Sequence, residues 1–168
     1  MRRMNDRPCS NRSALGCGRP LLVVAAAIVQ EGRLLVVSKK SAPDVFYLPG
    51  AKPDADEEAL ETLARELDEE LGVEPINTHF LAEVEAVAAL ESVPMRMTVF
   101  EAHISQVPRP AAELAHLRWA SGREQDLVLA PAVRDHVLPL LQRRGALAPV
   151  RPHNLTPTAP PWFGPPEP

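Results

Sequence analysis

Long apolar runs separated by short polar breaks mark the first third of the chain. Nine consecutive apolar residues occupy positions 21–29, and a second run follows at 34–37 after Gln30-Glu31-Gly32-Arg33. Uninterrupted apolar runs of this length are typical of buried strands. The pattern therefore predicts two strands, over about 21–30 and 33–39, joined in a hairpin by a Glu-Gly turn.

The apolar spacing then changes to that of a helix. A short strand at 46–48 precedes a predicted helix over 57–71, which ends at Gly72, the residue type favoured just past a helix C-terminus. Five apolar residues of this helix fall within about 100 degrees of one another on a helical wheel and predict its buried face. They are Leu60, Leu63, Ala64, Leu67 and Leu71.

The remaining elements follow from alternation and from proline and glycine. Alternating apolar and polar residues predict strands at about 79–89 and 95–105, and 117–119 reads as a further short strand. A last helix over 132–144 follows Pro131 and closes at Gly145. Strands on both sides of one central helix predict an α/β fold with a mixed sheet covered by helices.

Three carboxylates crowd one side of the predicted apolar stripe: Glu66, Glu69 and Glu70. Side chains three or four positions apart on a helix are neighbours, so like charges there repel by about 0.2–0.5 kcal/mol per pair. Glu69 and Glu70 also occupy the last turn, where the helix dipole opposes negative charge. A bound cation would reverse both penalties, whereas a solvated acidic face would simply tolerate them. The helix alone leaves both interpretations open.

The charge of the whole chain hides three blocks. The 168 residues carry a net charge of -4, yet residues 1–19 hold five arginines against one acid and residues 54–74 hold ten acids against Arg65. Eight of the 19 prolines lie within residues 148–168, too many for packed helix or sheet. We expect a basic leader over 1–19, one folded domain over 20–145 and a proline-rich tail over 146–168.

Composition also excludes several classes of protein. A mildly acidic chain with dispersed cations argues against a partner that is a nucleic acid polymer. A basic start before the apolar run 21–29 is compatible with a secretory signal, but the run is short and a second follows at once, so we favour a strand. No stretch approaches the roughly 20 apolar residues of a membrane span. Cys9 and Cys17 lack a metal-ligand spacing, and reduced thiols favour a cytoplasmic protein.

The acidic helix and the loop before it carry a specific motif. From Ala51, five residues lead to Glu57, and seven more lead to Arg65-Glu66-Leu67-Asp68-Glu69-Glu70-Leu71-Gly72-Val73. This pattern closely resembles the signature of the Nudix hydrolase family, with every defined position matched except the first, where Ala51 replaces glycine. The flanking elements, from about 21 to 144, are similar to the MutT-like branch. The resemblance implies a Nudix-type α/β/α sandwich with a mixed central sheet.

The resemblance also implies roles for individual residues. In such proteins the three motif carboxylates, here Glu66, Glu69 and Glu70, bind a divalent metal, and one carboxylate takes the proton of the attacking water. The motif arginine, Arg65, orients these carboxylates, and the early Glu57 supports the loop and helix. A backbone carbonyl at Gly50 completes the metal shell, and Gly72 ends the helix.

Two motif glycines are replaced in this chain, by Ala51 and Asp56. Glycine at such positions often permits a backbone angle that costs other residues about 1 kcal/mol or more, which predicts strain at Ala51 or an altered loop. Asp56 is instead expected to cap the N-terminus of the helix. All ligand carboxylates survive, so we expect reduced or retuned activity.

Further candidates lie outside the motif. Glu113 stands six residues before Trp119, where relatives often place another acidic metal ligand or base; Glu91 and Glu101 are weaker alternatives. The chain's three lysines flank the motif loop, and cations there would offset the charge of a diphosphate. We expect phosphate contacts from Lys52 and Lys39, with Lys40 a weaker candidate.

These residues predict a hydrolase, dependent on Mg²⁺ or Mn²⁺, that cleaves a diphosphate bond in a nucleoside diphosphate linked to another group. The partner is then a small-molecule nucleotide or other diphosphate, and a homodimer is possible. The stretch Pro131-Ala132-Val133 lacks the Asn with which similar proteins read oxidised guanine, so that substrate is disfavoured. The alternative is a non-catalytic Nudix-like domain that binds a nucleotide and regulates.

Overall fold

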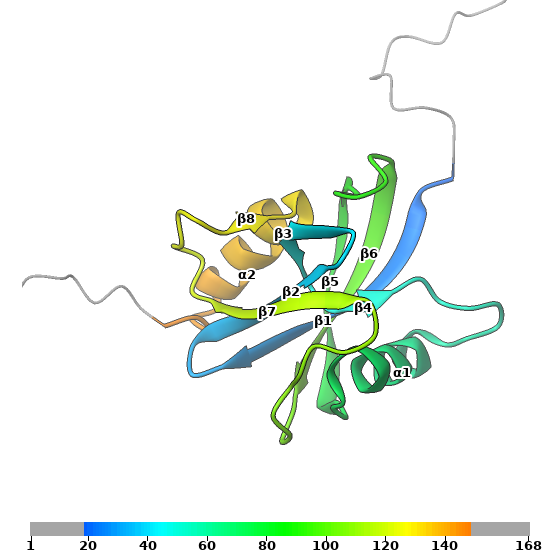
Figure 1. Cartoon of the computed structure of the whole chain (residues 1–168), viewed down its shortest axis with the longest axis horizontal. Helices are drawn as coiled ribbons and strands as arrows, with labels where there is room; N and C mark the ends of the chain where they lie inside the picture. Colours follow the sequence, from blue (N-terminus) through cyan, green and yellow to red (C-terminus); the bar gives the residue numbers. More distant parts are fainter. Residues whose placement is uncertain (1–18, 149–168) are drawn as a thin grey trace, which may run out of the picture.

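The computed structural model describes residues 19–148 (Figure 1). The two apolar runs form its central hairpin, β1 (Leu21–Gln30) and β2 (Arg33–Lys39), which confirms that prediction. Both turn residues, Glu31 and Gly32, have positive φ angles of 50° and 72°, as the tight hairpin turns that suit strand twist require. The predicted leader before Arg19, with both cysteines, lies outside the described residues, as does the predicted tail after Ala148.

The other strands extend this hairpin into one mixed, curled sheet. They are β3 (Ala42–Tyr47), β4 (Gly50–Ala51), β5 (Ile76–Val87), β6 (Pro94–His103), β7 (Leu114–Ala120) and β8 (Val128–Leu129). The strand order is β5-β6-β1-β2-β3-β8, with β4 paired to β1 and β7 paired to β2. The β1–β6 and β3–β8 pairs are parallel and the remaining pairs are antiparallel, so the expected mixed sheet is confirmed.

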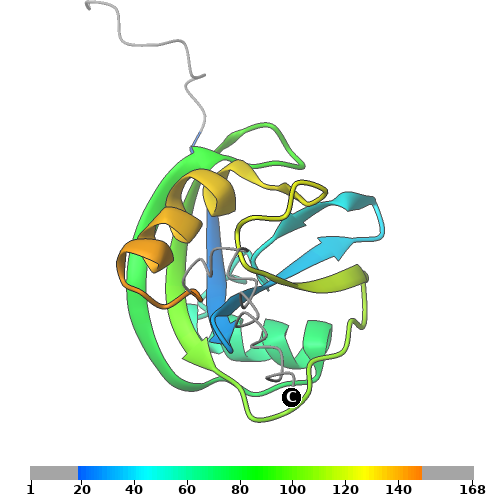
Figure 2. The same cartoon turned by 90° about the vertical axis from the view of Figure 1, so that its left-hand side faces the viewer.

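Helices cover the sheet from opposite sides (Figure 2). One layer is α1 (Ala59–Leu71), and the other is a six-residue π-helix, η1 (Ala132–Val137), that continues into α2 (Leu138–Arg143). The α/β/α sandwich is therefore confirmed, although the last helix begins with π rather than α hydrogen bonding. No helix in residues 19–148 is long and apolar enough to cross a membrane.

Alternate residues of the central hairpin point into two separate cores. Ala25, Leu34 and Val36 belong to the core that η1 and α2 cover. Their neighbours along the same strands belong to the core under α1, which contains Val24, Ala26, Ile28, Leu35, Val37, Leu63 and Leu67. Burial on both faces explains why β1 and β2 read as continuous apolar runs rather than as alternating ones.

The start and buried face of α1 differ from the prediction. Glu58 is the N-cap, and it forms a capping box with Glu61, so Asp56 does not cap the helix. Leu60 is 52% exposed and Ala64 is also exposed, whereas the polar residues Thr62 and Glu70 are buried. The buried face is therefore centred on Leu63 and Leu67 and is rotated from the predicted stripe toward one of the three carboxylates.

Candidate active site

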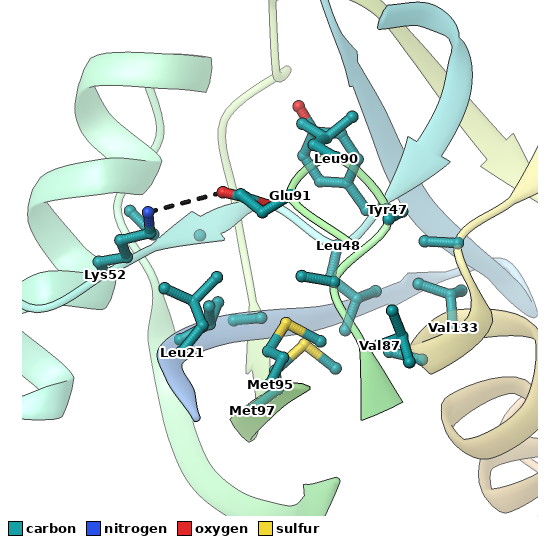
Figure 3. A pocket seen from close by; sticks show the side chains of 18 of the residues that line it. Leu21, Tyr47, Leu48, Lys52, Val87, Leu90, Glu91, Met95, Met97 and Val133 are labelled. Atoms are coloured by element: carbon teal, nitrogen blue, oxygen red, sulfur yellow. Dashed lines mark ion pairs between the residues drawn. The ribbon is translucent and has the colours of Figure 1, made fainter. Parts of the chain in front are cut away.

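A cavity of about 320 Å³ opens beside β4, between the central strands and η1 (Figure 3). Met95, Met97 and Leu48 form part of its apolar wall. Its charged lining residues include Lys39 and Lys52, the two lysines expected to contact phosphate. Lys52 Nζ lies 3.5 Å from Glu91 Oε1 in the β5–β6 loop. Glu91, which the sequence suggested weakly as a metal ligand, is thus the partner of a predicted phosphate-binding lysine.

Gly50 sits where β4 meets β1, at the edge of this cavity. Its φ is +144°, and a Cβ atom added there would lie 2.1 Å from the carbonyl oxygen of Val24. Only glycine fits that position. Ala51 has no positive φ and pairs with Val24 in the ladder, so the predicted strain at Ala51 is wrong. Asp56, at a φ of +66°, is the position that carries a backbone conformation suited to glycine.

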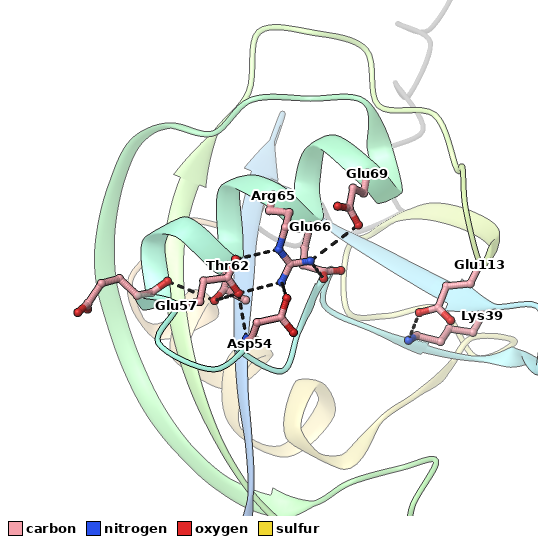
Figure 4. A network of polar contacts seen from close by, with 9 residues as sticks. Lys39, Asp54, Glu57, Thr62, Arg65, Glu66, Glu69 and Glu113 are labelled. Atoms are coloured by element: carbon pink, nitrogen blue, oxygen red, sulfur yellow. Dashed lines mark hydrogen bonds and ion pairs between the residues drawn. The ribbon is translucent and has the colours of Figure 1, made fainter.

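Glu57 ties the loop before α1 to the helix itself (Figure 4). Its carboxylate accepts two hydrogen bonds from Arg65, of 2.8 Å from Nε and 2.9 Å from Nη2, in a bidentate arrangement. The Thr62 hydroxyl and the Asp54 backbone N–H donate to the same carboxylate, at 2.8 and 3.0 Å. These hydrogen bonds, Arg65 foremost, lower the pKa of Glu57 to about 2.

Arg65 also reaches the first two metal-ligand candidates. Its Nη1 donates a 2.5 Å hydrogen bond to Glu66 Oε1 and lies 3.8 Å from Glu69 Oε2. The Glu66 side chain is largely shielded, whereas that of Glu69 is 58% exposed. Arg65 therefore links the supporting Glu57 on one side to two candidate ligands on the other, which is the geometry that an orienting residue requires.

Glu70 is the most unusual group in the site. The residue is 2% exposed, and neither carboxylate oxygen has a hydrogen-bond partner within residues 19–148. Burial, reinforced by the nearby Glu66 carboxylate, raises the pKa of Glu70 to about 7, against the attraction of Lys39 and a backbone contact from Gly50 that is too loose to count as a hydrogen bond. A buried carboxylate without a partner is costly, because desolvation of its charge is uncompensated.

The loop before β7 docks on the C-terminal end of α1. The backbone N–H groups of Arg109 and Ala111 donate to the carbonyl oxygens of Leu71 and Glu70, at 3.0 and 2.8 Å. These contacts satisfy carbonyls that a helix end leaves free. The same loop carries Glu113, whose side chain forms an ion pair with Lys39 (Figure 4) and whose charge acts on Glu70.

Glu70 provides a direct test of whether the residues fit a metal ion. Within residues 19–148 no three acidic, His or Cys side chains are already gathered as a finished metal site. The unpartnered oxygens of Glu70 nevertheless fit a bound cation, because positive charge would offset their desolvation. Carboxylate oxygens are also the ligands that Mg²⁺ and Mn²⁺ prefer. The Glu70 carboxylate is therefore suited to contribute to a site for a hard divalent cation.

Comparison with known proteins assigns this arrangement to a family. A model of the NUDIX domain matches residues 19–141, which is most of the chain. The chain belongs to the NUDIX family. A MutT NUDIX hydrolase from Burkholderia pseudomallei is 30% identical, with a TM-score of 0.62 over 70% of this chain and 95% of that one. The family and this MutT-like relative make the chain a Nudix pyrophosphohydrolase, a class that generally uses divalent metal cations.

More distant structures share the fold. The NUDIX domain of Shewanella oneidensis NrtR, solved with ADP ribose, is 21% identical, with a TM-score of 0.61 over 80% of this chain and 94% of that one. An ADP-ribose pyrophosphatase from Streptococcus suis is 20% identical, with a TM-score of 0.55 over 76% and 92% of the two chains. A search of the curated proteins gives no match.

Three features of the site escaped the sequence analysis. Glu70 is buried while Glu69 is exposed, although the motif treats the two alike. Burial together with the nearby Glu70 carboxylate raises the pKa of the Tyr47 hydroxyl at the cavity wall. Glu101, the other weak ligand candidate, instead lies 3.3 Å from Arg144 in an ion pair. The register of β6 and the docking of α1 decide these placements, and neither is visible in local sequence.

Proposed function

We propose that the protein hydrolyses a diphosphate bond in a nucleoside diphosphate linked to another group, with Mg²⁺ or Mn²⁺ as its cofactor. The observation that carries the proposal is Glu70, whose buried carboxylate has no hydrogen-bond partner in the described residues. Its charge acts on Tyr47, which lines the cavity. Lys39 and Lys52 line that cavity, so positive charge for a diphosphate lies beside the carboxylates.

The proposed metal ligands are the side chains of Glu66, Glu69 and Glu70, with the Gly50 carbonyl and Glu113 as further ligands. When bound, a divalent cation would neutralise diphosphate charge and lower the pKa of the attacking water. The position of Glu113 is set by its ion pair with Lys39 and by the loop before β7, which docks on the C-terminal end of α1.

The remaining roles belong to the protein's own groups. Arg65 holds Glu66 and is itself held by Glu57, which keeps one carboxylate in a defined rotamer. Lys52 and Lys39 would orient the phosphates as point charges at the cavity. The water proton would pass to Glu66, Glu69 or Glu113, each of which has a carboxylate near this acidic end of the helix.

A screen of hydrolysis, read out by chromatography of the nucleotide products, tests the proposal. Nucleoside triphosphates, nucleotide sugars, dinucleotides and ADP-ribose are incubated with the full chain and Mg²⁺ or Mn²⁺, beside Glu69→Gln. Asp68→Asn is the matched control, because it removes an exposed carboxylate from the neighbouring position of the same helix. We expect activity to require the metal, to fall by about 10²-fold or more in Glu69→Gln, and to persist in Asp68→Asn.

Two results would contradict the proposal. Equal activity of Glu69→Gln and wild type would remove Glu69 from the machinery. Nucleotide binding without turnover on any substrate, unaffected by Glu69→Gln, would instead establish the non-catalytic binding domain that the sequence left as the alternative.

A further inference from the structure

The interior of the cavity is apolar, and this limits the chemical groups that can bind there favourably. Met95, Met97, Leu48 and Val133 point into the same space from β6, from the segment after β3 and from η1 (Figure 3). Leu48, Met97 and Val133 are also buried core residues, so the wall is continuous with the core beneath η1. A cavity of about 320 Å³ lies at the lower end of the range for small-molecule pockets.

The polar side chains that line the cavity are few and carry mainly charge. Among residues 19–148 they are Lys39, Lys52, Glu91 and the Tyr47 hydroxyl, and no Asn, Gln, Asp, Ser, Thr, Arg or His side chain of this range lines the cavity. Several backbone donors nearby are already used. The N–H of Val133 donates to the Ala130 carbonyl, and that of Ala88 donates to the Val93 carbonyl.

This lining is unsuited to a purine base. A base edge carries several donors and acceptors, and burying them against Met97 and Val133 leaves them unpaired, at a cost of about 1–3 kcal/mol each. A site that selects a base by hydrogen bonds needs side chains that match its edge, and the cavity's lysines lie beside the motif loop, where a diphosphate would take them. An apolar group loses nothing by entering the same space.

We propose that the cavity binds an apolar hydrocarbon group on the X side of the substrate, while the diphosphate lies at the acidic helix and the nucleoside stays outside. This inference rests on the proposed function and narrows its substrate class to nucleoside diphosphates esterified by a hydrocarbon group. In the reaction, water adds to one phosphorus and the bond from that phosphorus to the bridging oxygen breaks. The products are a nucleoside monophosphate and an alkyl phosphate.

A series of alkyl esters tests the inference on the full-length protein. The β-phosphate of ADP is esterified with methyl, butyl and hexyl groups, and kcat/KM is measured with Mg²⁺. We expect kcat/KM to rise about threefold to fourfold for each CH₂ until the cavity is filled. The kcat/KM values for the butyl esters of ADP, GDP, CDP and UDP should agree within about tenfold, because the proposal gives the base no hydrogen-bonding side chain in the cavity.

A polar substitution in the wall provides a second readout. Met95→Gln keeps the side-chain length at a half-buried position of the cavity wall and should reduce the increase in kcat/KM per CH₂. Val107→Gln, at a residue that is 78% exposed and outside the cavity, should leave that increase unchanged. Calorimetric affinities of the corresponding α,β-methylene analogues should follow the same order without any turnover. Thermal unfolding establishes that both variants are folded.

The possible outcomes separate the two proposals. Hydrolysis of every ester with kcat/KM flat or falling with chain length would overturn the apolar assignment and leave the proposed function standing. A preference of about 10³-fold for one base would overturn it as well, because it would require a hydrogen-bonding reader. Failure to hydrolyse any ester, nucleotide or nucleotide sugar would overturn the proposed function itself. An unchanged chain-length gain in a folded Met95→Gln protein would place the alkyl group elsewhere.

Discussion

At the scale of single residues, the backbone conformation that requires glycine in the motif loop lies at Gly50, one position before Ala51. The departure from glycine at Ala51 is conspicuous in the sequence, yet Gly50 carries the positive φ and the close approach to Val24. Ala51 occupies ordinary strand backbone. The second departure, Asp56, does take a positive φ, which an L-residue adopts at a cost.

Exchanging each of these residues for glycine should therefore have opposite effects. Asp56→Gly relieves the positive φ and should raise the free energy of unfolding by up to about 1 kcal/mol. Ala51→Gly frees an unstrained strand residue and should lower it by about 0.5–1 kcal/mol. Urea unfolding of both variants measures the difference. A larger stabilisation by Ala51→Gly would contradict the structure, whereas unchanged turnover in that variant would agree with it.

The Glu57–Arg65 pair predicts a pH-dependent contribution to stability. The folded-state pKa of Glu57 lies near 2, below its ordinary value of 4.5, so the stabilisation is fully present above about pH 4.5 and is lost as the pH falls toward 2. Glu57→Gln should consequently lower the Tm at pH 7, and the gap to wild type should narrow between pH 4.5 and pH 3.

Glu74→Gln is the control for this experiment, because it removes one exposed carboxylate just beyond the same helix. Its Tm should follow that of wild type at both pH values. A gap between Glu57→Gln and wild type that is constant from pH 7 to pH 3 would show that the variant acts through packing rather than through the ionised carboxylate.

The motif identified which acids crowd the helix but not which of them is buried. Spacing places Glu66, Glu69 and Glu70 on one arc, and a wheel cannot rank neighbours that lie at the edge of the buried face. Docking of α1 against β1 and β4 decides that Glu70 points inward and Leu60 outward. Such a rotation depends on contacts distant in sequence, so periodicity alone could not predict it.

At the scale of elements, the long and strongly patterned segments were predictable and the short ones were not. β1 and β2 follow from their apolar runs, and Gly72 ends α1 in the left-handed conformation, as expected. The two-residue strands β4 and β8 have no pattern of their own, because they form only where a neighbouring strand offers free backbone groups. The π-helical start of η1 likewise has no signal in side-chain spacing.

Two loops meet at the ion pair of Lys52 and Glu91, one before α1 and one between β5 and β6. If Lys52 contacts phosphate, Glu91 competes for it. Glu91→Gln should then lower KM by up to about fivefold, since an exposed pair is worth at most about 1 kcal/mol. Lys52→Gln should raise KM with kcat little changed.

Steady-state kinetics on whichever substrate the screen identifies provide the measurement for this pair. Glu85→Gln, which breaks a 3.0 Å surface pair with Arg96 outside the cavity, is the matched control and should not change KM. The double variant should behave like Lys52→Gln alone. A lowered KM in the double variant would mean that Glu91 acts on substrate directly and not through Lys52.

At the scale of the whole molecule, the packed unit continues past the predicted boundary at residue 145. Leu147 is buried in the core beneath α2, and the Ala148 backbone N–H donates a 2.8 Å hydrogen bond to the Gly32 carbonyl in the β1–β2 turn. Proline content indicated a tail from 146 onward, but composition cannot show that a single residue, Leu147, packs into the core.

Truncation measures the contribution of these residues. A chain of residues 19–148 should keep the Tm and hydrolytic activity of the full chain, because every residue assigned to the site and to the two cores falls within this range. A chain of residues 19–145 should lose about 1.5–3 kcal/mol through exposure of the Leu147 site, which lowers the Tm by several degrees. Equal thermal stability of the two truncated chains would contradict the packing of Leu147.

The pairing of the central hairpin has a consequence for how the chain folds. β1 is flanked by β6 and β2 by β7, and the paired residues are 74 positions apart for β1–β6 and 75 to 86 positions apart for β2–β7. Contacts this distant are slow to form, because loop-closure entropy precedes their gain. During synthesis, one edge of β1 lacks its partner β6 and one edge of β2 lacks its partner β7 until those strands have left the ribosome, so nascent chains that stop before Ala120 still have an unpaired edge and are exposed to aggregation.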